Sequence, residues 1–517
     1  MENLLVITEI QVLILSILAT IIYFSLLKFK KPSKDVAKAS ILIFISFITS
    51  LCALYYLKTI FEPNHLFSTV FIVFCVACIV ILKLLKIYTP KIGVIFAFLI
   101  ITVLTLSYNC YSPYWSRQHD SRSFDSPENG GHFGYIGYIF NNNKLPTGSP
   151  IGIWCFYNPP LFYIISTIVM KIVVAIKDSV DIGFEVVQLL SFAYTVIFNI
   201  YVYRILKEIN IKKSIIPLLF FVGLSPALII MSGSINNDIL SITLSTMAIY
   251  YTMVWYKEDS LKNLIKIALT ISLAIMTKIS AALIAIGIAI VFLTKVIKNK
   301  KDFIRYLKHF TIFALIALPI GLWFPTKNLV LYDVPITYVQ SVDESNSANI
   351  SRYSTFDRFF KINDNHLETT NIDMSAENAE YNLYTTTLKS FIIDEHIEYE
   401  ENKILKFVIP ALFYVSITIS IAYLISLIYA LINRKKLNNW MYFFLLIGIL
   451  QIGSYINFCF GFPFTFTMNF RYIVPTLITY SAITGIVSDK NKLLFNVNTA
   501  LISIFSCLSI LMFTNLI

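Results

Sequence analysis

The sequence predicts an all-α membrane protein that crosses the bilayer about fourteen times. Hydrophobic residues make up 57% of the 517 residues and charged residues only 14%, and the mean hydropathy is +0.72. A soluble chain of this size could not bury so much apolar surface, so most of it must face lipid or other helices. Long apolar runs recur along the chain, and lysines and arginines cluster between alternate runs. Together these observations indicate a polytopic helical bundle.

Fourteen apolar runs come close to the length that an α-helix needs to cross a bilayer. In chain order they are Leu4–Leu27, Ala39–Leu57, Leu66–Leu85, Gly93–Tyr108, Glu185–Leu206, Ser214–Met231, Ile239–Tyr256, Leu264–Met276, Ile279–Ile297, His309–Phe324, Ile404–Ile432, Trp440–Phe460, Tyr472–Val487 and Leu493–Leu516.

Basic clusters predict which loops face the cytoplasm, because lysine and arginine collect in cytoplasmic loops. The clusters are Lys28–Lys38, Lys83–Lys91, Arg204–Lys213, Lys295–Lys308, Arg434–Lys436 and Lys490–Lys492. Alternation from these anchors predicts a multi-pass protein of the cell membrane with both chain ends outside. The clusters also account for the net charge of +11, which we therefore do not attribute to nucleic-acid binding.

Four regions follow from this topology. Residues 1–92 hold the first three runs, and residues 93–325 hold seven more and a first outer loop at 109–184. Residues 326–403 form a second outer loop with fourteen acidic and six basic side chains, and residues 404–517 hold the last four runs. The run Pro160–Ile176 would invert every later basic cluster if it crossed. We therefore expect it to lie at the outer interface, with Lys171 reaching the headgroups.

The first outer loop contains the polar pair His119-Asp120, followed by Asp125, Glu128 and His132. A carboxylate in a partly dry pocket can accept a proton from an attacking hydroxyl, because desolvation raises its basicity. The plainer interpretation of Asp125 and Glu128 is that they cap solvated turns. A metal cluster of His119, Asp120 and His132 has no recognised ligand spacing, so no metal ligand is assigned and a divalent metal stays an open alternative.

Three further polar segments lie at the predicted outer ends of spans. In "SGSINNDIL", Asn236 and Asn237 could cap the next helix, with Asp238 in its first turn. In "MTKIS", the turn at Lys278 has no acid beside it in sequence, so its ammonium suits a phosphate or snorkels to the headgroups.

The last segment, "MNFRYIVP", carries Arg471 with Tyr472 at the outer mouth of a span. The planar guanidinium of arginine binds phosphate oxygens at two points. Two acids and two bases that converge outside would suit a lipid phosphate donor and a hydroxyl acceptor. Cys110 and Cys155 lie on either side of the polar stretch, and a disulfide between them stays open because sequence carries no geometry.

In this order the segments resemble the GT-C superfamily of membrane glycosyltransferases. The resemblance rests on "GHFGYIGYIFNNNKLP", "FYNPPLFYIIS", "INNDILS", "TKIS" and "NFRYIVP", and it covers Gly93 to about Val487. It is closest to bacterial relatives of the protein O-mannosyltransferases and the aminoarabinose lipid A transferases. It implies a GT-C-like bundle with outer juxtamembrane helices. It also implies transfer of a sugar from a polyprenyl-phosphate carrier to an acceptor hydroxyl outside the cytoplasm.

The resemblance also implies roles for single residues. Asp120 takes the place of the catalytic acid of the first loop, and Asp238 matches the second acidic position. Lys278 and Arg471 match basic positions near the carrier phosphate. His119, His132, Asn237 and Tyr472 are further candidates for substrate binding. The sequence departs from the family where His119 precedes Asp120 and where no lysine precedes Pro159-Pro160, so the donor sugar and the acceptor, whether protein, lipid or polysaccharide, stay open.

The mechanism expected from these residues is a single inverting displacement. Asp120 would take the proton of the acceptor hydroxyl while Lys278 and Arg471 stabilise the departing phosphate. A phosphate leaving group needs no general acid, unlike the leaving group of glycoside hydrolysis. The alternatives are a transporter or flippase of lipid-linked sugars and a non-catalytic partner of a membrane assembly. Transporters often carry inverted repeats and broken helices, and no repeat is visible in the sequence.

Overall fold

The computed structural model describes residues 75–76, 79, 82–83, 88–115, 130–362, 370–394 and 402–516. The predicted runs at Leu4–Leu27 and Ala39–Leu57, and most of the run at Leu66–Leu85, lie outside the described residues. Throughout the described part the chain is helical, and its β-structure is limited to one isolated bridge between Asn349 and Phe464. The predicted fold class, an all-α polytopic membrane protein, is therefore confirmed, while the total of fourteen spans stays a prediction.

The helices begin and end close to the predicted apolar runs. The first group is α4 (Pro90–Tyr111), α5 (Gly131–Asn142), α6 (Leu161–Lys177), α7 (Val180–Glu208), α8 (Ile215–Gly223), α9 (Pro226–Ser232), α10 (Asp238–Glu258) and α11 (Leu261–Ile275). The second group is η2 (Ile279–Ala281), α12 (Ala282–Lys298), η3 (Lys300–Asp302), α13 (Phe303–Tyr332), α14 (Thr355–Phe360), α16 (Leu383–Ile393), α17 (Leu405–Ile432), η4 (Arg434–Lys436), α18 (Trp440–Gly461), η5 (Thr465–Thr467), η6 (Phe470–Ile473), α19 (Thr476–Ser488) and α20 (Lys492–Leu516).

Eight helices of the described part are long and apolar enough to cross a bilayer, and ten spans result if each of two bent helix pairs counts as one. Each of the eleven apolar runs predicted after residue 92 coincides with one of the eight long helices, with one of the two bent pairs, or with α11. With only 15 residues, α11 is about 22 Å long at 1.5 Å per residue, which is shorter than the hydrocarbon core of about 30 Å. It is nevertheless packed along its length between α10 and α13.

Two of the predicted continuous runs are broken in the structure. Ser214–Met231 becomes α8 and α9, which meet at an angle of 53°, and Tyr472–Val487 belongs to a second pair, bent by 52° between η6 and α19. Each break lies at a proline. Ser225, before Pro226, has the extended conformation that a following proline favours. Pro475 caps α19 and cannot donate a backbone hydrogen bond to the preceding turn. The apolar runs predicted from the sequence did not indicate these two bends.

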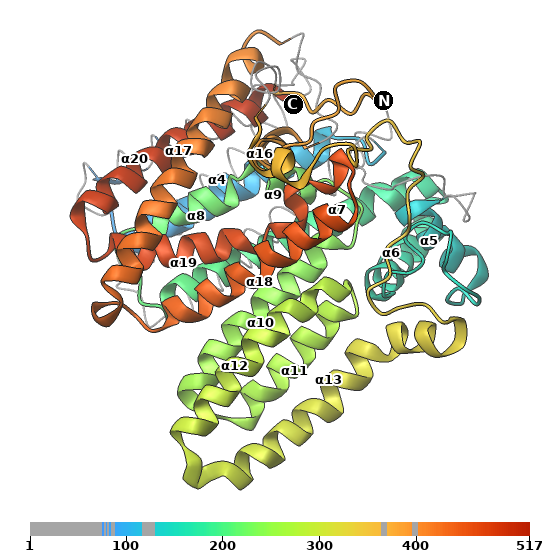
Figure 1. The fold of residues 1–517 in the computed structure, drawn as a ribbon, viewed down its shortest axis with the longest axis horizontal. Helices are drawn as coiled ribbons and strands as arrows, with labels where there is room; N and C mark the ends of the chain where they lie inside the picture. The colour runs from blue at the N-terminus through green and yellow to red at the C-terminus, as the bar shows by residue number, and fades with distance from the viewer. Residues whose placement is uncertain are drawn as a thin grey trace.

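The helices form two main groups (Figure 1). Helices α10, α11, α12 and α13 run along one side, and α17 to α20 form the other group together with α4 and α8. Helices α5 and α6 lie beside α7 at one edge of the molecule. Helix α13 contains Pro319 and Pro325 and continues to Tyr332, seven residues beyond the predicted region boundary at residue 325.

Helix α6 corresponds to the run at Pro160–Ile176 that was predicted to lie at the interface. With 17 residues it falls outside the eight candidate spans. It packs on α5 and α7, and Ile168, Ile172 and Ile176 form an exposed apolar stripe on the face turned away from them. The Lys171 ammonium donates to the side chain of Asn143, and its contact with the headgroups stays a prediction. The position of α6 at the interface stays a prediction.

Candidate functional site

The centre of the site is an ion pair between Asp238 and Lys278. Asp238 is the first residue of α10, and Lys278 lies just after α11, forty residues further along the chain. The Lys278 ammonium donates to Asp238 Oδ1. The carboxylate side chain is 5% exposed and the lysine side chain 23% exposed, so the ammonium is the member that can be reached. From the sequence we expected the Lys278 ammonium to have no acidic partner, because no acid is its neighbour along the chain. That expectation was wrong, because helix packing brings Asp238 into contact with it.

Arg471 and Tyr472 lie on the open side of this ion pair. The Lys278 ammonium is 5.1 Å from the centroid of the Tyr472 ring, and the Arg471 guanidinium is 4.8 Å from it. Arg471 Nη2 also donates to the Tyr472 hydroxyl at 2.8 Å. Tyr472 therefore holds both cations, by cation–π attraction and by a hydrogen bond. Arg471 is close enough to Asp238 to act on its charge.

His132 approaches the same carboxylate from α5, and it is also among the charges that act on Asp238. The imidazole is 4% exposed, and its Nδ1 lies 2.9 Å from the Tyr163 hydroxyl. Tyr163 lies against His132 on one side and stacks on Tyr135 at 4.0 Å on the other. Since Tyr163 and Tyr135 are fully buried, this stack fixes the imidazole and leaves it little room to turn.

Two asparagines before α10 shape the approach to Asp238. Asn237 donates from Nδ2 to the Thr277 carbonyl at 2.9 Å, which ties the start of α10 to the turn that carries Lys278. Asn236 accepts from the backbone N–H of Asp238 at 3.0 Å, the contact of an Asx-turn. The capping role proposed from sequence thus belongs to Asn236. Leu161, just after the proline pair, donates its N–H to the Met276 carbonyl at 3.2 Å, so the first outer loop also supports this turn.

Sequence reasoning missed a set of buried side chains that hold the segment before Asp238. The carbonyls of Ser232, Gly233 and Ser234 each accept a hydrogen bond from one of them: Asn109 Nδ2 at 2.8 Å, Gln188 Nε2 at 2.8 Å and Ser191 Oγ at 2.6 Å, in that order. Gln188 also donates to the Ser112 carbonyl at 2.9 Å. Gln188 therefore links the beginning of the first outer loop to the Asp238 segment. Amides inside predicted spans were the available signal, because polar groups at membrane depth are costly unless they are used.

The turn that carries Arg471 rests on α16, which belongs to the second outer loop. Asn469 accepts from the Arg471 N–H at 2.9 Å and donates to Asp394 Oδ1 at 2.8 Å. Ser390 accepts from the Phe470 N–H at 2.9 Å and donates to the Met468 carbonyl at 3.3 Å. The second outer loop is therefore part of the wall of the site and not only a cap above it.

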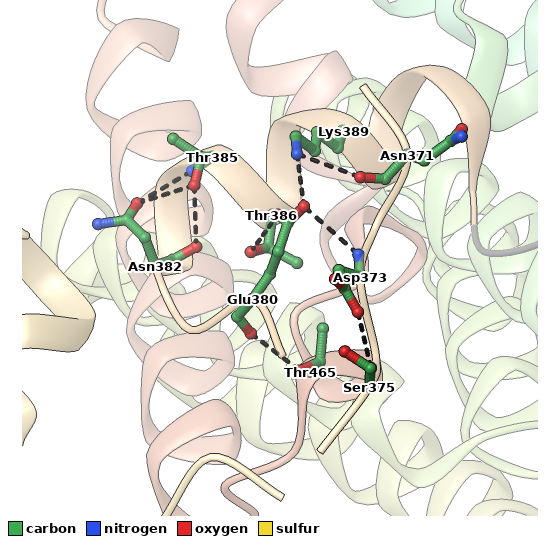
Figure 2. A network of polar contacts seen from close by, with 9 residues as sticks. All are labelled: Asn371, Asp373, Ser375, Glu380, Asn382, Thr385, Thr386, Lys389 and Thr465. Carbon is green, nitrogen blue, oxygen red and sulfur yellow. Dashed lines mark hydrogen bonds and ion pairs between the residues drawn. The ribbon is translucent and has the colours of Figure 1, made fainter. Parts of the chain in front are cut away.

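A second, fully buried ion pair anchors α16 (Figure 2). The Lys389 ammonium donates to Glu380 Oε1 and to the Asn371 carbonyl at 3.2 Å, and the two paired side chains are 0% and 1% exposed. Burial raises the pKa of Glu380 and lowers the pKa of Lys389, while each partner opposes part of that shift in the other.

The same network reaches the segment before Arg471. Thr386 Oγ1 donates to Glu380 Oε2 at 3.3 Å, and Thr465 Oγ1 donates to the Glu380 carbonyl at 2.8 Å. Asn382 caps α16 by accepting from the N–H groups of Tyr384 and Thr385, each at 3.1 Å. Glu380 thus joins α16, the segment before it and the chain that leads into η6.

The structure brings together six of the eight predicted site residues: His132, Asn237, Asp238, Lys278, Arg471 and Tyr472. The other two, His119 and Asp120, lie outside the described residues, as do Asp125 and Glu128. In the described ranges no group of three His, Cys, Asp or Glu side chains could hold a metal ion. The proposed cluster with His119 and Asp120 is therefore not tested. Cys110 and Cys155 do not form a disulfide with each other.

The chemistry of the assembled site is that of an anion-binding site next to a carboxylate. Among the described residues, two cations, Lys278 and Arg471, lie near one carboxylate, that of Asp238. An ammonium has three donors, and among the described residues the carboxylate of Asp238 accepts from Lys278. Phosphate and carboxylate are the anions that such a pair of side chains recognises best.

Residues 157–323 match the model of a protein family described as dolichyl-phosphate-mannose-protein mannosyltransferase. The matched stretch includes Asn237, Asp238 and Lys278 but ends before Arg471. None of the curated proteins compared with the chain matches it. The family match confirms the resemblance to GT-C glycosyltransferases and, with the apolar helices, supports a membrane glycosyltransferase of the mannosyltransferase type.

Proposed function

We propose that this chain transfers a sugar from a polyprenyl-phosphate carrier to a hydroxyl acceptor on the extracytoplasmic side of the cell membrane. The observation that carries the proposal is that Lys278 and Arg471 both lie against the ring of Tyr472, and that Lys278 also pairs with Asp238. A sugar phosphate placed there would meet two cations at the oxygens that gain charge as the glycosidic bond breaks. Electrostatic stabilisation of that charge is the main catalytic contribution available to such residues.

The reaction proposed is one inverting displacement. The acceptor oxygen attacks the anomeric carbon, the bond from that carbon to the phosphate oxygen breaks, and the electron pair leaves with the polyprenyl phosphate. The acceptor proton passes to a carboxylate, for which Asp120 is the candidate. The Lys278 ammonium would bridge Asp238 and the phosphate, and His132 would keep the buried side of Asp238 in place. No protonation of the leaving group is needed.

We infer the side of the membrane that the site faces from the opposite ends of α7, α10 and α12. There, Lys257 pairs with Glu208 at 2.5 Å, and Arg305 pairs with Asp259 at 2.7 Å. Lys295 donates to the Tyr256 carbonyl at 2.7 Å. The basic clusters thus gather at the ends of α7, α10 and α12 that are opposite to Asp238. Since cytoplasmic loops are enriched in lysine and arginine, the site is proposed to face outward.

This topology predicts the outcome of a labelling experiment. In a variant that lacks the native cysteines, Ser149→Cys should react with a membrane-impermeant maleimide in intact cells, because Ser149 is exposed in the first outer loop. Lys301→Cys, which is exposed at the far helix ends, should react only after the cells are permeabilised. The reverse pattern would contradict the proposed orientation.

Variants of the two cations should bind donor more weakly. Removing one charged hydrogen bond is worth about 1.5–3 kcal/mol, so Lys278→Gln and Arg471→Gln should each lower affinity for a polyprenyl-phosphate sugar by roughly ten-fold to a hundred-fold. Binding would be measured on the purified protein in detergent. The matched control is Lys301→Gln at the opposite ends of the helices, which should bind as the parent does.

A double variant separates donor binding from the loss of the ion pair. Lys278→Gln leaves Asp238 without its ion-pair partner, whereas Lys278→Gln/Asp238→Asn removes the charges of both members of that ion pair. The double variant should regain thermal stability and still bind donor weakly. Parent-like affinity in both the double variant and Arg471→Gln would remove the cations from the donor site.

The second candidate function is a transporter or flippase of lipid-linked sugars. The observation in its favour is the pair of broken helices, α8–α9 and η6–α19, which both end beside the site, because discontinuous helices are common at transporter binding sites. The two functions differ in a simple assay. A transporter moves labelled carrier across a vesicle membrane without acceptor, and a transferase releases polyprenyl phosphate only when acceptor is present.

A further inference from the structure

A second group of cations and aromatic rings lies at the other ends of the helices, away from the candidate site. The Arg204 guanidinium of α7 is 4.8 Å from the ring centroid of Tyr201 and 5.8 Å from that of Tyr250. The Lys266 ammonium of α11 is 5.1 Å from the ring of Tyr251. The hydroxyls of Tyr201 and Tyr251 are 2.7 Å apart, so the two halves of the group are joined. Three helices therefore contribute to one cluster.

The two cations of this cluster are not neutralised. Within the described ranges, neither Arg204 nor Lys266 makes an ion pair with an acid. Glu208 and Glu258 are close enough to act on the charge of Tyr250 in this cluster. Glu208 pairs with Lys257 at 2.5 Å, and Glu258 accepts from Asn263 at 3.0 Å. Two half-buried positive charges are therefore available to a ligand.

The positions of Arg204 and Lys266 along their helices indicate which kind of ligand they would bind. Arg204 lies four residues before the end of α7, and Lys266 lies five residues after the start of α11. At 1.5 Å per residue these positions are about 6 to 8 Å inside the helix ends. Cations at that depth can extend to lipid headgroups. Tyr201, Tyr250 and Tyr251 lie seven or eight residues from the same helix ends, about 10 to 12 Å inside them.

If Arg204 and Lys266 extended to the headgroups independently of each other, they would not need to share the hydrogen-bonded pair Tyr201 and Tyr251. Here Tyr201 and Tyr251 hold both cations on one surface between α7, α10 and α11. We propose that this cluster, Tyr201–Arg204–Tyr250–Tyr251–Lys266, binds the phosphate of an anionic phospholipid headgroup. Basic pockets between membrane helices are known to recognise such headgroups. The proposal does not depend on the sugar-transfer function, because it concerns residues far along the helices from Asp238.

The test uses the purified full chain in detergent and measures which lipids it retains by native mass spectrometry. The parent should retain phosphatidylglycerol in preference to phosphatidylcholine. Arg204→Gln/Lys266→Gln should weaken the retention of phosphatidylglycerol by about ten-fold or more, since two charged hydrogen bonds are lost. Lys262→Gln is the matched control, because Lys262 is exposed on the same turn region of α11 and contacts none of the three rings. It should retain phosphatidylglycerol as the parent does.

Three outcomes would overturn the proposal. They are equal retention of phosphatidylglycerol by the parent and the double variant, equal retention of the two lipids by the parent, and displacement of phosphatidylglycerol by millimolar inorganic phosphate. The last would show a site for a free anion rather than for a lipid. If the double variant unfolds, the single variant Lys266→Gln tests the same proposal with a smaller change. If Lys266→Gln retains phosphatidylglycerol as the parent does, the proposal is again contradicted.

Discussion

Asp120→Asn should lower the rate of sugar transfer by about two to four orders of magnitude, which is the usual contribution of a general base. Donor affinity should stay near that of the parent, because the proposed phosphate contacts belong to Lys278 and Arg471. The asparagine keeps the shape and volume of the side chain but cannot accept the proton. The rate would be measured in proteoliposomes with a labelled polyprenyl-phosphate sugar and a cell-envelope extract as acceptor.

The other acids of the first outer loop provide the controls. Asp125→Asn and Glu128→Gln remove a carboxylate from the same loop, and each should transfer sugar at nearly the parent rate. A loss of activity in all three variants would point to a role of the loop as a whole rather than of Asp120.

Asp238 is the rival for the role of base. Its carboxylate already accepts from the Lys278 ammonium, so it would have to give up part of an ion pair to take up a proton. We therefore assign Asp238 to the positioning of Lys278. If Asp120→Asn transfers at the parent rate while Asp238→Asn is inactive, the two roles must be exchanged. If both variants remain fully active, sugar transfer is not the function of this site.

The sequence predicted the helices well where a single physical signal dominates. A run such as Ile404–Ile432 is long and apolar and has a single charged residue, Lys406, near its start. The structure forms α17 over Leu405–Ile432. The breaks at Pro226 and Pro475 escaped notice because hydropathy does not distinguish a straight helix from a bent pair. The prolines themselves were visible, and their effect on the preceding turn could have been weighed.

Individual residues of the site could be predicted from the sequence, but the contacts between them could not. Asp238, Lys278 and Arg471 each attracted attention because a charge near the membrane is costly. The ion pair between Asp238 and Lys278 joins residues forty positions apart, and only the packing of α10 against α11 brings them into contact. Gln188 was overlooked because it is a single amide within an apolar run, and Asn109 because it directly follows one. Their partners are backbone carbonyls, which leave no trace in the sequence.

The second outer loop was the least predictable part. Its sequence is polar and acidic, which is typical of a solvated segment. The structure instead buries Glu380 and Lys389 almost completely and uses α16 to support the turn at Arg471. A buried pair of opposite charges cannot be distinguished by composition from two exposed ones.

Breaking the buried pair should cause the largest loss of stability among the variants considered. Lys389→Met leaves the Glu380 carboxylate buried without its cation, and Glu380→Gln leaves the Lys389 ammonium without its anion. Removal of one partner of a buried ion pair costs about 3–5 kcal/mol. Each single variant should therefore have a clearly lower unfolding midpoint, measured by thermal denaturation of the full chain in detergent.

The double variant Glu380→Gln/Lys389→Met should be much more stable than either single variant. It leaves no unpaired charge, and the new amide can still accept from the Thr386 hydroxyl, which donates to Glu380 at 3.3 Å. Replacement of a complete buried pair is often close to neutral. The exposed pair provides the control: Lys257, 54% exposed, pairs with Glu208, and Lys257→Gln should cost at most about 1 kcal/mol.

The same variants test whether α16 supports the proposed donor site. Lys389→Met should weaken donor binding as well as stability, because the Arg471 turn rests on Ser390, the next residue of α16. The double variant should recover both properties together. Donor binding that stays at the parent level in a clearly destabilised Lys389→Met protein would show that the Arg471 turn does not depend on this anchor. Equal stability of the single variants and the parent would show that Glu380 and Lys389 are not a buried pair in the folded protein.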